Sequence, residues 1–315
     1  MGTLFGYLMI ILCQFSASVN VVGSKHLVSD LNVFFLMETR FLIAAVILFI
    51  AWLFVGKKNR PEHVKLSALK RSDWVLLIFQ ALCAGAFFNL LLLLGMRYTS
   101  ANNAAIITSA IPAMVAFLSI FILKQILTRY KLICIVFATV GLFVINGSKI
   151  NINGSLDGFF GDMLIVIAII PESLYYVLSK IRNIRLPVLL LSSIINAINA
   201  LFMLPFVFLF PSTIPTHISG LDLSLLLLVG LASGLFYIGW AKGCQYIDGA
   251  TAGIMTALMP IFAIILSVLF LHEAIGWLQI IGMVLILASI VFSNMGGLIK
   301  KFKPKKFRLS KKAQI

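Results

Sequence analysis

Four side chains with polar, reactive groups lie at helical spacing within one apolar segment of the sequence. Tyr175, Tyr176 and Ser179 follow Glu172 by three, four and seven residues, so all four would lie along one face of a helix. A carboxyl group in an apolar segment can exchange a proton or bind an ammonium group, and the phenol and hydroxyl groups can share hydrogen bonds with it. We therefore predict a site for proton exchange and for binding a cationic organic group.

Polar and aromatic side chains in other apolar segments could complete this site. Asn89, Tyr237 and Trp240 are candidates to face the stripe, and Asn20 corresponds to Tyr175 when the two halves of the chain are aligned. Amide, phenol and indole groups around an apolar cavity suit an amphipathic organic solute better than a bare ion. The same side chains could instead pack and bond across helices, and both interpretations stay open for Tyr237 and Trp240.

The composition of the chain sets its class. Apolar residues make up 61% of the 315 residues and charged residues only 11%, and the mean hydropathy is +1.09. A soluble domain could not cover itself with so few charges, so we predict an integral membrane protein. Continuous apolar segments of about 20 residues favour membrane helices over a barrel. Ten such segments lie at 4–24, 32–55, 74–95, 101–123, 130–147, 160–180, 187–210, 222–243, 250–271 and 276–298.

Glu38, Arg40 and Glu172 are acidic or basic residues that lie inside these segments and away from their ends. At such depth a charge costs a few kcal/mol and normally faces a cavity or a partner. Glu172 lies about 18 Å deep, at roughly 1.5 Å of rise per residue, and therefore near the midplane. Glu38 and Arg40 lie in the outer third of the second segment and on different faces, since two residues turn a helix by about 200°. We predict proton coupling at Glu172, with Glu38 as a second candidate. For Arg40 we predict pairing with another helix, with substrate contact as the alternative.

The chain contains an internal repeat. Residues 98–145 align without a gap onto 246–293, a shift of 148 that places Pro112 on Pro260. A weaker match, shifted by 155, relates the first and sixth segments. Internal duplication of an apolar chain is typical of transporters built from structural repeats. We predict that both prolines kink or loosen their helices at matching depths and act as pivots, because proline removes a backbone donor and clashes with the preceding turn.

Positive charges are unevenly distributed between the two ends of the predicted segments. Twenty-one Lys and Arg residues fall on one side and three on the other, which predicts that the first side is cytoplasmic and holds both termini. Because each half has five segments, the second half must enter the membrane from the opposite side. We therefore predict an all-α membrane protein of ten transmembrane helices in two inverted repeats, residues 1–150 and 151–299. The basic tail at 300–315 is interpreted as a tether to anionic lipid, not as a nucleic-acid-binding segment.

Motifs for other chemistries are incomplete. No Gly-rich loop ending in Lys-Ser or Lys-Thr is present, so ATP is not indicated as a driver. His272 and Glu273 lack the second histidine of a zinc-protease helix, and the four cysteines lie within apolar segments as small buried side chains. We expect no metal, no cofactor and no enzymatic activity. A polytopic membrane enzyme or a purely structural membrane protein is the alternative of another class.

Three stretches of the chain carry a family pattern. They are Glu38 to Ala45, Ala101 to Lys124 with Pro112 at its centre, and Gly249 to Glu273 with Pro260 at its centre. These stretches resemble the drug/metabolite transporter superfamily, EamA type, and the resemblance covers nearly the whole chain. It implies two inverted five-helix halves and transport of amino acids, other metabolites, nucleotide sugars, vitamins or S-adenosylmethionine. Where members often carry a Trp near the start of the sixth helix, this chain has Pro171 and Glu172.

These features together predict a secondary active transporter of a small organic metabolite that works by alternating access. One buried acid could hold an ammonium group, so an amino acid or related amine is the first candidate, and the resemblance favours export. The alternative is an importer of a nucleoside, a vitamin or an S-adenosylmethionine-like nutrient. We expect the lipid bilayer, a small-molecule substrate and protons as partners, no nucleic acid, and a homodimer as a candidate assembly. The expected location is the bacterial cytoplasmic (inner) membrane, crossed several times by the chain.

Overall fold

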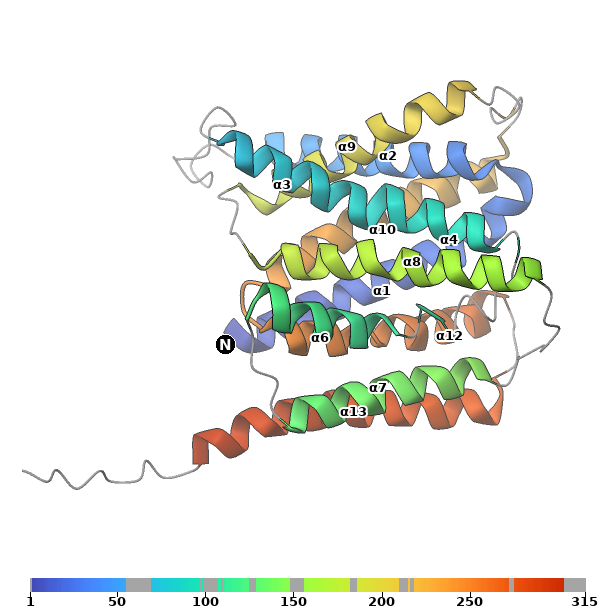
Figure 1. Cartoon of the computed structure of the whole chain (residues 1–315). Helices are drawn as coiled ribbons and strands as arrows, with labels where there is room; N and C mark the ends of the chain where they lie inside the picture. The colour runs from blue at the N-terminus through green and yellow to red at the C-terminus, as the bar shows by residue number, and fades with distance from the viewer. Residues whose placement is uncertain are drawn as a thin grey trace, which may run out of the picture.

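The structure, a computed structural model, describes residues 2–54, 69–96, 98, 107–108, 110–124, 129–147, 156–181, 186–209, 215, 218–271 and 275–302. Every regular element in these ranges is helical. In chain order the elements are α1 (Gly2–Asp30), α2 (Val33–Phe54), α3 (Arg71–Leu82), η3 (Cys83–Phe87), α4 (Phe88–Met96), α6 (Ile111–Ile122), α7 (Arg129–Gly147), α8 (Leu156–Leu178), α9 (Val188–Leu209), α10 (Gly220–Gly243), α11 (Gly249–Met255), α12 (Leu258–Leu271) and α13 (Trp277–Phe302). Figure 1 shows that they run roughly along one common direction.

Seven helical stretches in the described ranges are long and apolar enough to cross a membrane. Shorter apolar stretches, Ile111–Ile122, Leu132–Gly141 and Ile280–Ile290, lie within the predicted fourth, fifth and tenth segments. The third predicted segment is a continuous run of α3, η3 and α4, and the ninth is divided into α11 and α12. The prediction of an all-α integral membrane protein is confirmed.

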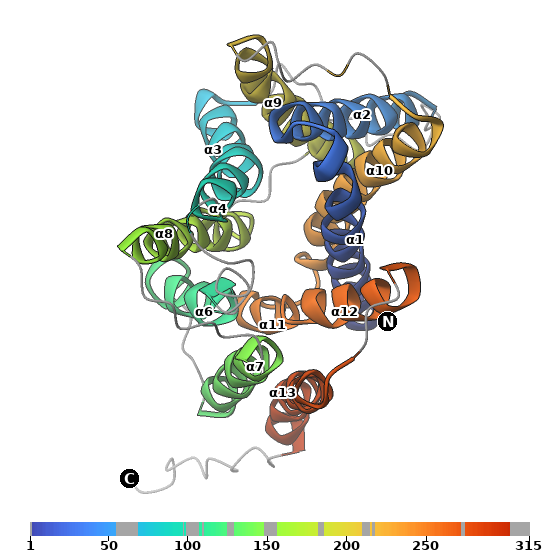
Figure 2. The same ribbon diagram turned by 90° about the vertical axis from the view of Figure 1, so that its right-hand side faces the viewer.

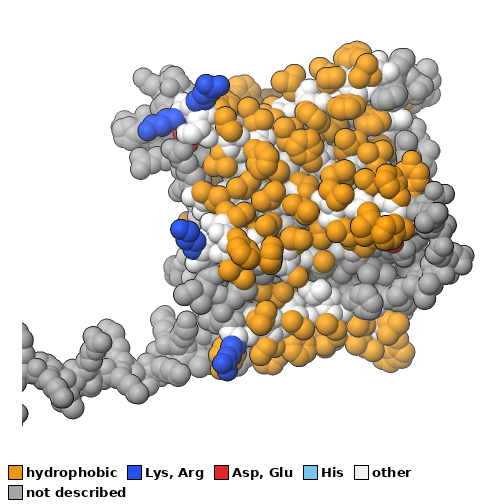
Figure 3. Space-filling model, in the orientation of Figure 1, with side chains coloured by type: hydrophobic (Ala, Val, Ile, Leu, Met, Phe, Trp, Pro, Cys, Tyr) orange, Lys and Arg blue, Asp and Glu red, His pale blue; other side chains and the backbone are white. Residues whose placement is uncertain are grey.

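The outer surface of the bundle is apolar. Figure 3 shows hydrophobic side chains across one face of the molecule, with the described Lys and Arg side chains gathered at one edge. Leu201, for example, is 70% exposed. Soluble proteins rarely expose apolar surface of this extent, whereas a lipid bilayer solvates it. We call the end where α3 begins and α6 ends the basic end; its exposed side chains include Lys70, Arg71, Lys124 and Arg129.

The contacts between helices repeat when the two halves of the chain are exchanged. Packing of α1 on α10 corresponds to packing of α8 on α4, and packing of α1 on α12 corresponds to packing of α8 on α6. The contact of α2 with α10 corresponds to that of α9 with α3, while α2 with α9 and α7 with α13 pair equivalent helices directly. Figure 2 shows these two direct pairs on opposite sides of the bundle. Such a pattern is expected of two similar units related by a pseudo-twofold axis.

Both repeat-related prolines lie in the first turn of a helical segment. α6 begins at Ile111, immediately before Pro112, and Pro260 is the third residue of α12, which follows a short break after α11. In that break Thr256 and Ala257 donate backbone hydrogen bonds to carbonyls three residues earlier, where an α-helix uses four. Proline is tolerated in a first turn because its missing N–H would be unpaired there anyway. The pivot role stays a prediction, and part of the fourth segment lies outside the described residues.

The third predicted segment contains a π-helical turn that the sequence did not indicate. In η3 the backbone N–H of Phe88 bonds to the carbonyl of Cys83, five residues earlier. Gly85 in this turn lies directly against the side chain of Asn199 on α9, and an added Cβ would overlap that amide. Turns of this kind interrupt α-helices frequently at functional sites, and this one lies beside the polar groups described below.

Close packing of α1 on α10 depends on small residues. A Cβ added to Gly239 would lie 2.6 Å from the carbonyl oxygen of Met9, and one added to Gly243 would lie 2.6 Å from Ile10. Small residues four apart on one face allow two membrane helices to approach closely. The glycines therefore set the distance between α1 and α10, and with it the position of the α10 side chains that face the interior.

We expect Gly239→Ala to destabilise the folded protein, because the new methyl group must push α1 away from α10. Overpacking of this kind costs about 1–3 kcal/mol, which should lower the melting temperature measured in detergent. Gly220→Ala, at the start of α10, is the matched control, since nothing lies within 4 Å of a Cβ built there. Equal melting temperatures for the two variants would contradict the described contact of α1 with α10.

Candidate functional site

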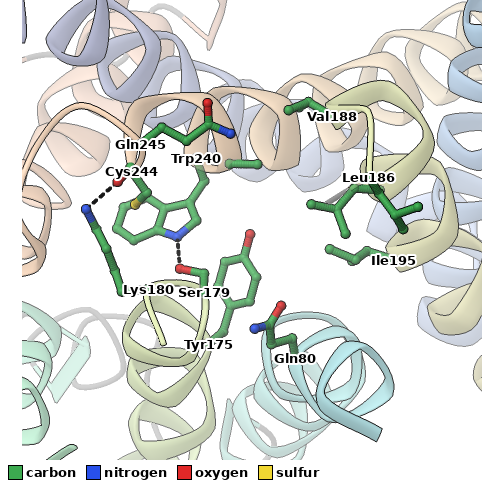
Figure 4. A pocket seen from close by; sticks show the side chains of 12 residues that line it. Gln80, Tyr175, Ser179, Lys180, Leu186, Val188, Ile195, Trp240, Cys244 and Gln245 are labelled. Carbon is green, nitrogen blue, oxygen red and sulfur yellow. Dashed lines mark hydrogen bonds between the residues drawn. The ribbon is translucent and has the colours of Figure 1, made fainter. Parts of the chain in front are cut away.

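A cavity of about 190 Å³ lies between α3, α8, α9 and α10. Tyr175 and Trp240 lie on one side of it, and Leu186 and Ile195 lie across the space from them (Figure 4). The lining also includes Gln80 of α3, and Lys180 and Gln245, which follow α8 and α10 at the basic end. The cavity therefore opens toward the basic end. With aromatic and polar groups on one side and aliphatic groups on the other, it suits a small amphipathic solute.

Four buried rings, called the aromatic cluster, join α8 to α10 beside this cavity. Tyr175 and Tyr176 come from α8, Tyr237 and Trp240 come from α10, and each is at most 5% exposed. The ring centroids of Tyr176 and Trp240 are 4.2 Å apart, and the rings of Tyr175 and Tyr237 meet edge to face at 5.7 Å. The structure thus brings together four of the predicted site residues. Their contact with a substrate stays a prediction.

Ser179 connects the aromatic cluster to the end of α8. The indole Nε1 of Trp240 donates a hydrogen bond to Ser179 Oγ over 2.7 Å, and Ser179 Oγ donates to the carbonyl of Tyr176 over 2.9 Å. A buried indole N–H normally finds such a partner. The bond joins α8 and α10 at the wall of the cavity (Figure 4).

A second link between these helices was missed in the sequence. The ammonium group of Lys180, at the end of α8, donates hydrogen bonds to the carbonyl oxygens of Cys244 and Ile247, just beyond α10. A cation is favoured at this position because the last carbonyls of a helix are unpaired and carry its negative dipole end. From the sequence, Lys180 was only one of many basic residues at a segment end, since its partners are backbone atoms.

Glu172 lies one helical turn farther from the basic end than Tyr175 and Tyr176, and it is 6% exposed. The Tyr176 phenol shares a hydrogen bond with its carboxyl group. Its other oxygen, Oε2, is buried and has no hydrogen-bond partner among the described residues. Leaving a buried acceptor unpaired costs about 1–3 kcal/mol. Because Tyr175 lines the cavity and Glu172 does not, the carboxyl group lies beyond the aromatic cluster as seen from the cavity.

Arg40 on α2 reaches another helix, as predicted. Its Nη2 donates a hydrogen bond to Asn89 Oδ1 on α4 over 3.0 Å, and the guanidinium lies 4.7 Å from the centre of the Phe41 ring. Asn89 Nδ2 in turn donates to the carbonyl of Gly85 in η3 over 2.6 Å. The predicted interhelical pairing of Arg40 is confirmed. Asn89, predicted to face the substrate, is the residue that holds Arg40 in place.

Tyr237 lies near both the Glu172 carboxyl group and the Arg40 guanidinium group. Both the Glu172 carboxyl and the Arg40 guanidinium act electrostatically on its phenol, which also shares a hydrogen bond with the side chain of Asn199 on α9. Asn199 is fully buried, and its Oδ1 has no hydrogen-bond partner among the described residues. Asn199 was not predicted as a site residue. Two amide side chains three residues apart in one apolar segment, Asn196 and Asn199, would have indicated a polar helix face there. We call Arg40, Asn89, Glu172, Asn199 and Tyr237 the polar centre.

Two predicted site residues lie apart from the polar centre. The side chain of Asn20 on α1 and Ser233 Oγ on α10 are 3.1 Å apart, so Asn20 bonds across the α1–α10 interface. Glu38 is half-buried on α2, and its carboxyl group bonds to the neighbouring Thr39. No contact in the described ranges joins Glu38 to Glu172. Its role as a second proton-coupling group stays a prediction.

The prediction of four buried cysteines holds for three of them and is wrong for Cys244, which follows the end of α10. Cys13, Cys83 and Cys134 are buried, while Cys244 is half-buried and lines the cavity. Among the described residues no group of three or more His, Cys, Asp or Glu side chains could hold a metal ion. His272 and Glu273 lie outside the described residues.

Comparison with known proteins decides the family of this bundle. A model described as the EamA-like transporter family matches residues 4–147 and 159–295. The chain belongs to this family. It is similar to the uncharacterized transporter YetK of Bacillus subtilis strain 168, with 31% identity over 303 residues, 92% of this chain and 87% of YetK. YyaM, an uncharacterized transporter of the same organism, is 27% identical over 81% of this chain and 82% of its own length.

The fold of this chain is also found among solved structures. A crystal structure of another protein superposes on this EamA-like chain with a TM-score of 0.76 and 17% identity, covering 96% of this chain and 98% of the other. At this identity the likeness shows the fold alone. The resemblance found in the sequence is confirmed, and the EamA-like chain is a multi-pass membrane transporter.

We expect the hydrogen bond between Trp240 and Ser179 to contribute about 1 kcal/mol to the stability of this EamA-like transporter. Trp240→Phe removes the indole donor and keeps an aromatic ring, while Ser179→Ala removes the acceptor. Because both variants lose the same bond, the double variant should lose about 1 kcal/mol less unfolding free energy than the sum of the two single losses. The measurement is a double-mutant cycle of unfolding in mixed micelles. Strictly additive losses would show that the bond contributes nothing.

Proposed function

We propose that this EamA-like chain is a secondary active transporter of a small organic metabolite carrying an amino group, with an amino acid or related amine as first candidate. The observation that carries the proposal is the buried Oε2 of Glu172, which has no partner among the described residues. It lies beyond an aromatic cluster that borders a cavity open to the basic end. A carboxylate at this depth suits an ammonium group, and the cluster suits the apolar part of the same solute.

Alternating access is supported by a difference between equivalent positions of the two halves. The positions on α1 and α4 that correspond to the aromatic cluster hold smaller side chains. Val21, equivalent to Tyr176, is 48% exposed, whereas Tyr176 is 5% exposed. Leu92, equivalent to Trp240, is only partly buried. The two halves therefore pack differently around one centre, and exchanging these packings would move the opening from one end to the other.

Coupling to protons follows from the same carboxyl group. If Glu172 releases a proton when a substrate ammonium group binds, and regains one when that group leaves, each carried cation exchanges for a proton. The charge inside the membrane then stays balanced through the cycle, which avoids the cost of moving an unpaired charge through hydrocarbon.

The charge distribution supports a location and a direction. The basic end corresponds to the cytoplasmic side under the positive-inside rule, so both termini would be cytoplasmic in a bacterial inner membrane. A cavity that opens at this end receives solute from the cytoplasm, as an exporter requires.

The test of this function is solute release from proteoliposomes loaded with the small-molecule fraction of a cell extract, followed by untargeted mass spectrometry. We expect at least one amine or amino acid to leave faster than from protein-free vesicles, at a rate that depends on the pH gradient. Glu172→Gln should remove the dependence on the gradient and keep part of the downhill exchange, because it removes the titrating group but preserves hydrogen bonding.

Two further variants make this test specific. Asp162→Asn removes a carboxyl group elsewhere on α8 and should leave the dependence on the pH gradient unchanged. Glu38→Gln examines the second candidate for proton coupling. If Glu38→Gln abolishes the gradient dependence while Glu172→Gln leaves it intact, Glu172 is a packed side chain without a coupling role.

The proposed orientation predicts opposite labelling of two loops. Single cysteines placed at 57–71 and at 148–158 in a cysteine-free background should react with an impermeant maleimide from the cytoplasmic and the external side, respectively. Right-side-out and inside-out vesicles provide the two directions of access. Labelling of both loops from the same side would overturn the inverted orientation of the two halves.

A further inference from the structure

We propose that the polar centre binds a zwitterion, with the substrate ammonium group on Glu172 and Asn199 and the substrate carboxylate on Arg40. The inference rests on the proposed function and narrows its substrate class from amines in general to solutes that carry both charges. It adds Arg40 and Asn199 to the substrate-binding residues. For Arg40, substrate contact was the alternative that the sequence left open beside pairing with another helix, whereas nothing in the sequence assigned Asn199 to the site.

The first observation is a cation without a counter-ion. Arg40 forms no ion pair among the described residues; its named partners are the Asn89 amide and the Phe41 ring, both uncharged. Its Nε is buried and has no hydrogen-bond partner in the part of the chain that the structure describes. Charged side chains within membrane spans usually pair with an opposite charge. A guanidinium with an unused N–H presents the planar donor fork that binds a carboxylate.

The second observation is a pair of unused acceptors on the other side. Glu172 Oε2 and Asn199 Oδ1 are both buried without partners in the described ranges. The Asn199 amide nitrogen is already used, because Nδ2 donates to the carbonyl of Ile195 over 3.1 Å. A carboxylate oxygen and an amide oxygen are suitable acceptors for an ammonium group, which carries three donors and no acceptor. The two oxygen atoms without partners are therefore acceptors suited to an ammonium group.

The third observation is the position of Tyr237. Its phenol is influenced by the Glu172 carboxyl and by the Arg40 guanidinium, and it bonds to Asn199. The two ionisable groups therefore both lie near one fixed side chain, and they form no ion pair with each other. A solute that bridges this side chain can neutralise both. A solute with one charge leaves the opposite buried group unpaired, which is costly in a site of low polarity.

The arrangement also predicts selectivity. Sites built to bond a polar group reject analogues that lack it far more strongly than sites that only enclose an apolar group. We expect a bound amino acid to lose at least about tenfold in affinity when either its carboxylate or its amino group is removed.

The experiment measures ligand-induced thermal stabilisation of the purified full-length protein. The probes are the twenty protein amino acids, each at a series of concentrations, because a ligand that binds only the folded state raises its melting temperature. For every amino acid that stabilises, the decarboxylated amine and the deaminated acid of the same side chain are then compared; for phenylalanine these are phenethylamine and 3-phenylpropanoate. We expect at least one amino acid to bind, and both of its analogues to bind at least about tenfold more weakly.

Variants of the protein test which residue binds each charged group of the substrate. Arg40→Gln should weaken the amino acid to the level of its amine, and Glu172→Gln should weaken it to the level of its deaminated acid. Arg40→Lys keeps a cation at the same position and should retain part of the preference for the zwitterion. The comparison of probes on the unchanged protein needs no variant, so a folding defect in Arg40→Gln does not affect it.

Two outcomes overturn the proposal while leaving transport intact. One is an amine that binds as tightly as its amino acid, which would show a site for cations alone. The other is a solute released from extract-loaded proteoliposomes although none of the twenty amino acids stabilises the protein. Absence of release of any solute would instead contradict the proposed function itself.

Discussion

Two ionisable side chains occupy the interior of a bundle that is surrounded by hydrocarbon. Glu172 and Arg40 come from different halves of the chain, and neither forms an ion pair within the described residues. Because hydrocarbon solvates neither group, the surrounding helices must supply donors, acceptors and rings. The Tyr176 phenol contacts the carboxyl group, the Asn89 amide contacts the guanidinium, and Tyr237 lies near both. These contacts require α2, α4, α8 and α10 to lie close together.

Close helix packing makes that placement possible. Gly239 and Gly243 bring α10 against α1, which aims the rings of α10 toward α8. On the opposite side of the centre, Gly85 in the π-helical turn leaves room for the Asn199 side chain. A methyl group at either place would move a helix, because the nearest atoms belong to a backbone or to a buried amide. The polar groups are thus positioned by residues that carry no functional side chain.

The described polar links between α8 and α10 are few and individually weak. The Trp240–Ser179 bond and the Lys180 bonds to two carbonyls are single hydrogen bonds at the basic end, each contributing only about 1 kcal/mol or somewhat more for the charged donor. The breaks before Pro112 and Pro260 lie on the helices that pack against α8 and α1. The side chains of the aromatic cluster are larger than those at the equivalent positions of α1 and α4, so the two halves of the chain pack differently around the polar centre.

Local features of this protein followed from the sequence, because they depend on residues near in the chain. Apolar segment length predicted the membrane helices, and spacing of three, four and seven placed Glu172, Tyr175, Tyr176 and Ser179 on one face. The duplicated proline predicted a local disturbance in two related helices. Only the structure showed that each proline lies in the first turn of a helix, because the helix starts there are defined by the backbone hydrogen bonds. Family membership was also recognisable, since it rests on patterns contained within single segments.

Only the tertiary structure decided which side chains meet. The partners of Lys180 are backbone carbonyls, whose position no residue type reveals. Asn199 has room beside α3 and α4 because Gly85, in the π-helical turn η3, has no side chain at the point of contact, and only the folded chain brings the two residues together. Asn20 is equivalent to Tyr175 in the repeat, but it bonds within the α1–α10 interface, where its shorter side chain contacts Ser233. Spacing along the chain determines the face that a residue occupies, whereas its partner depends on how separate helices pack, and that packing is settled by the whole fold.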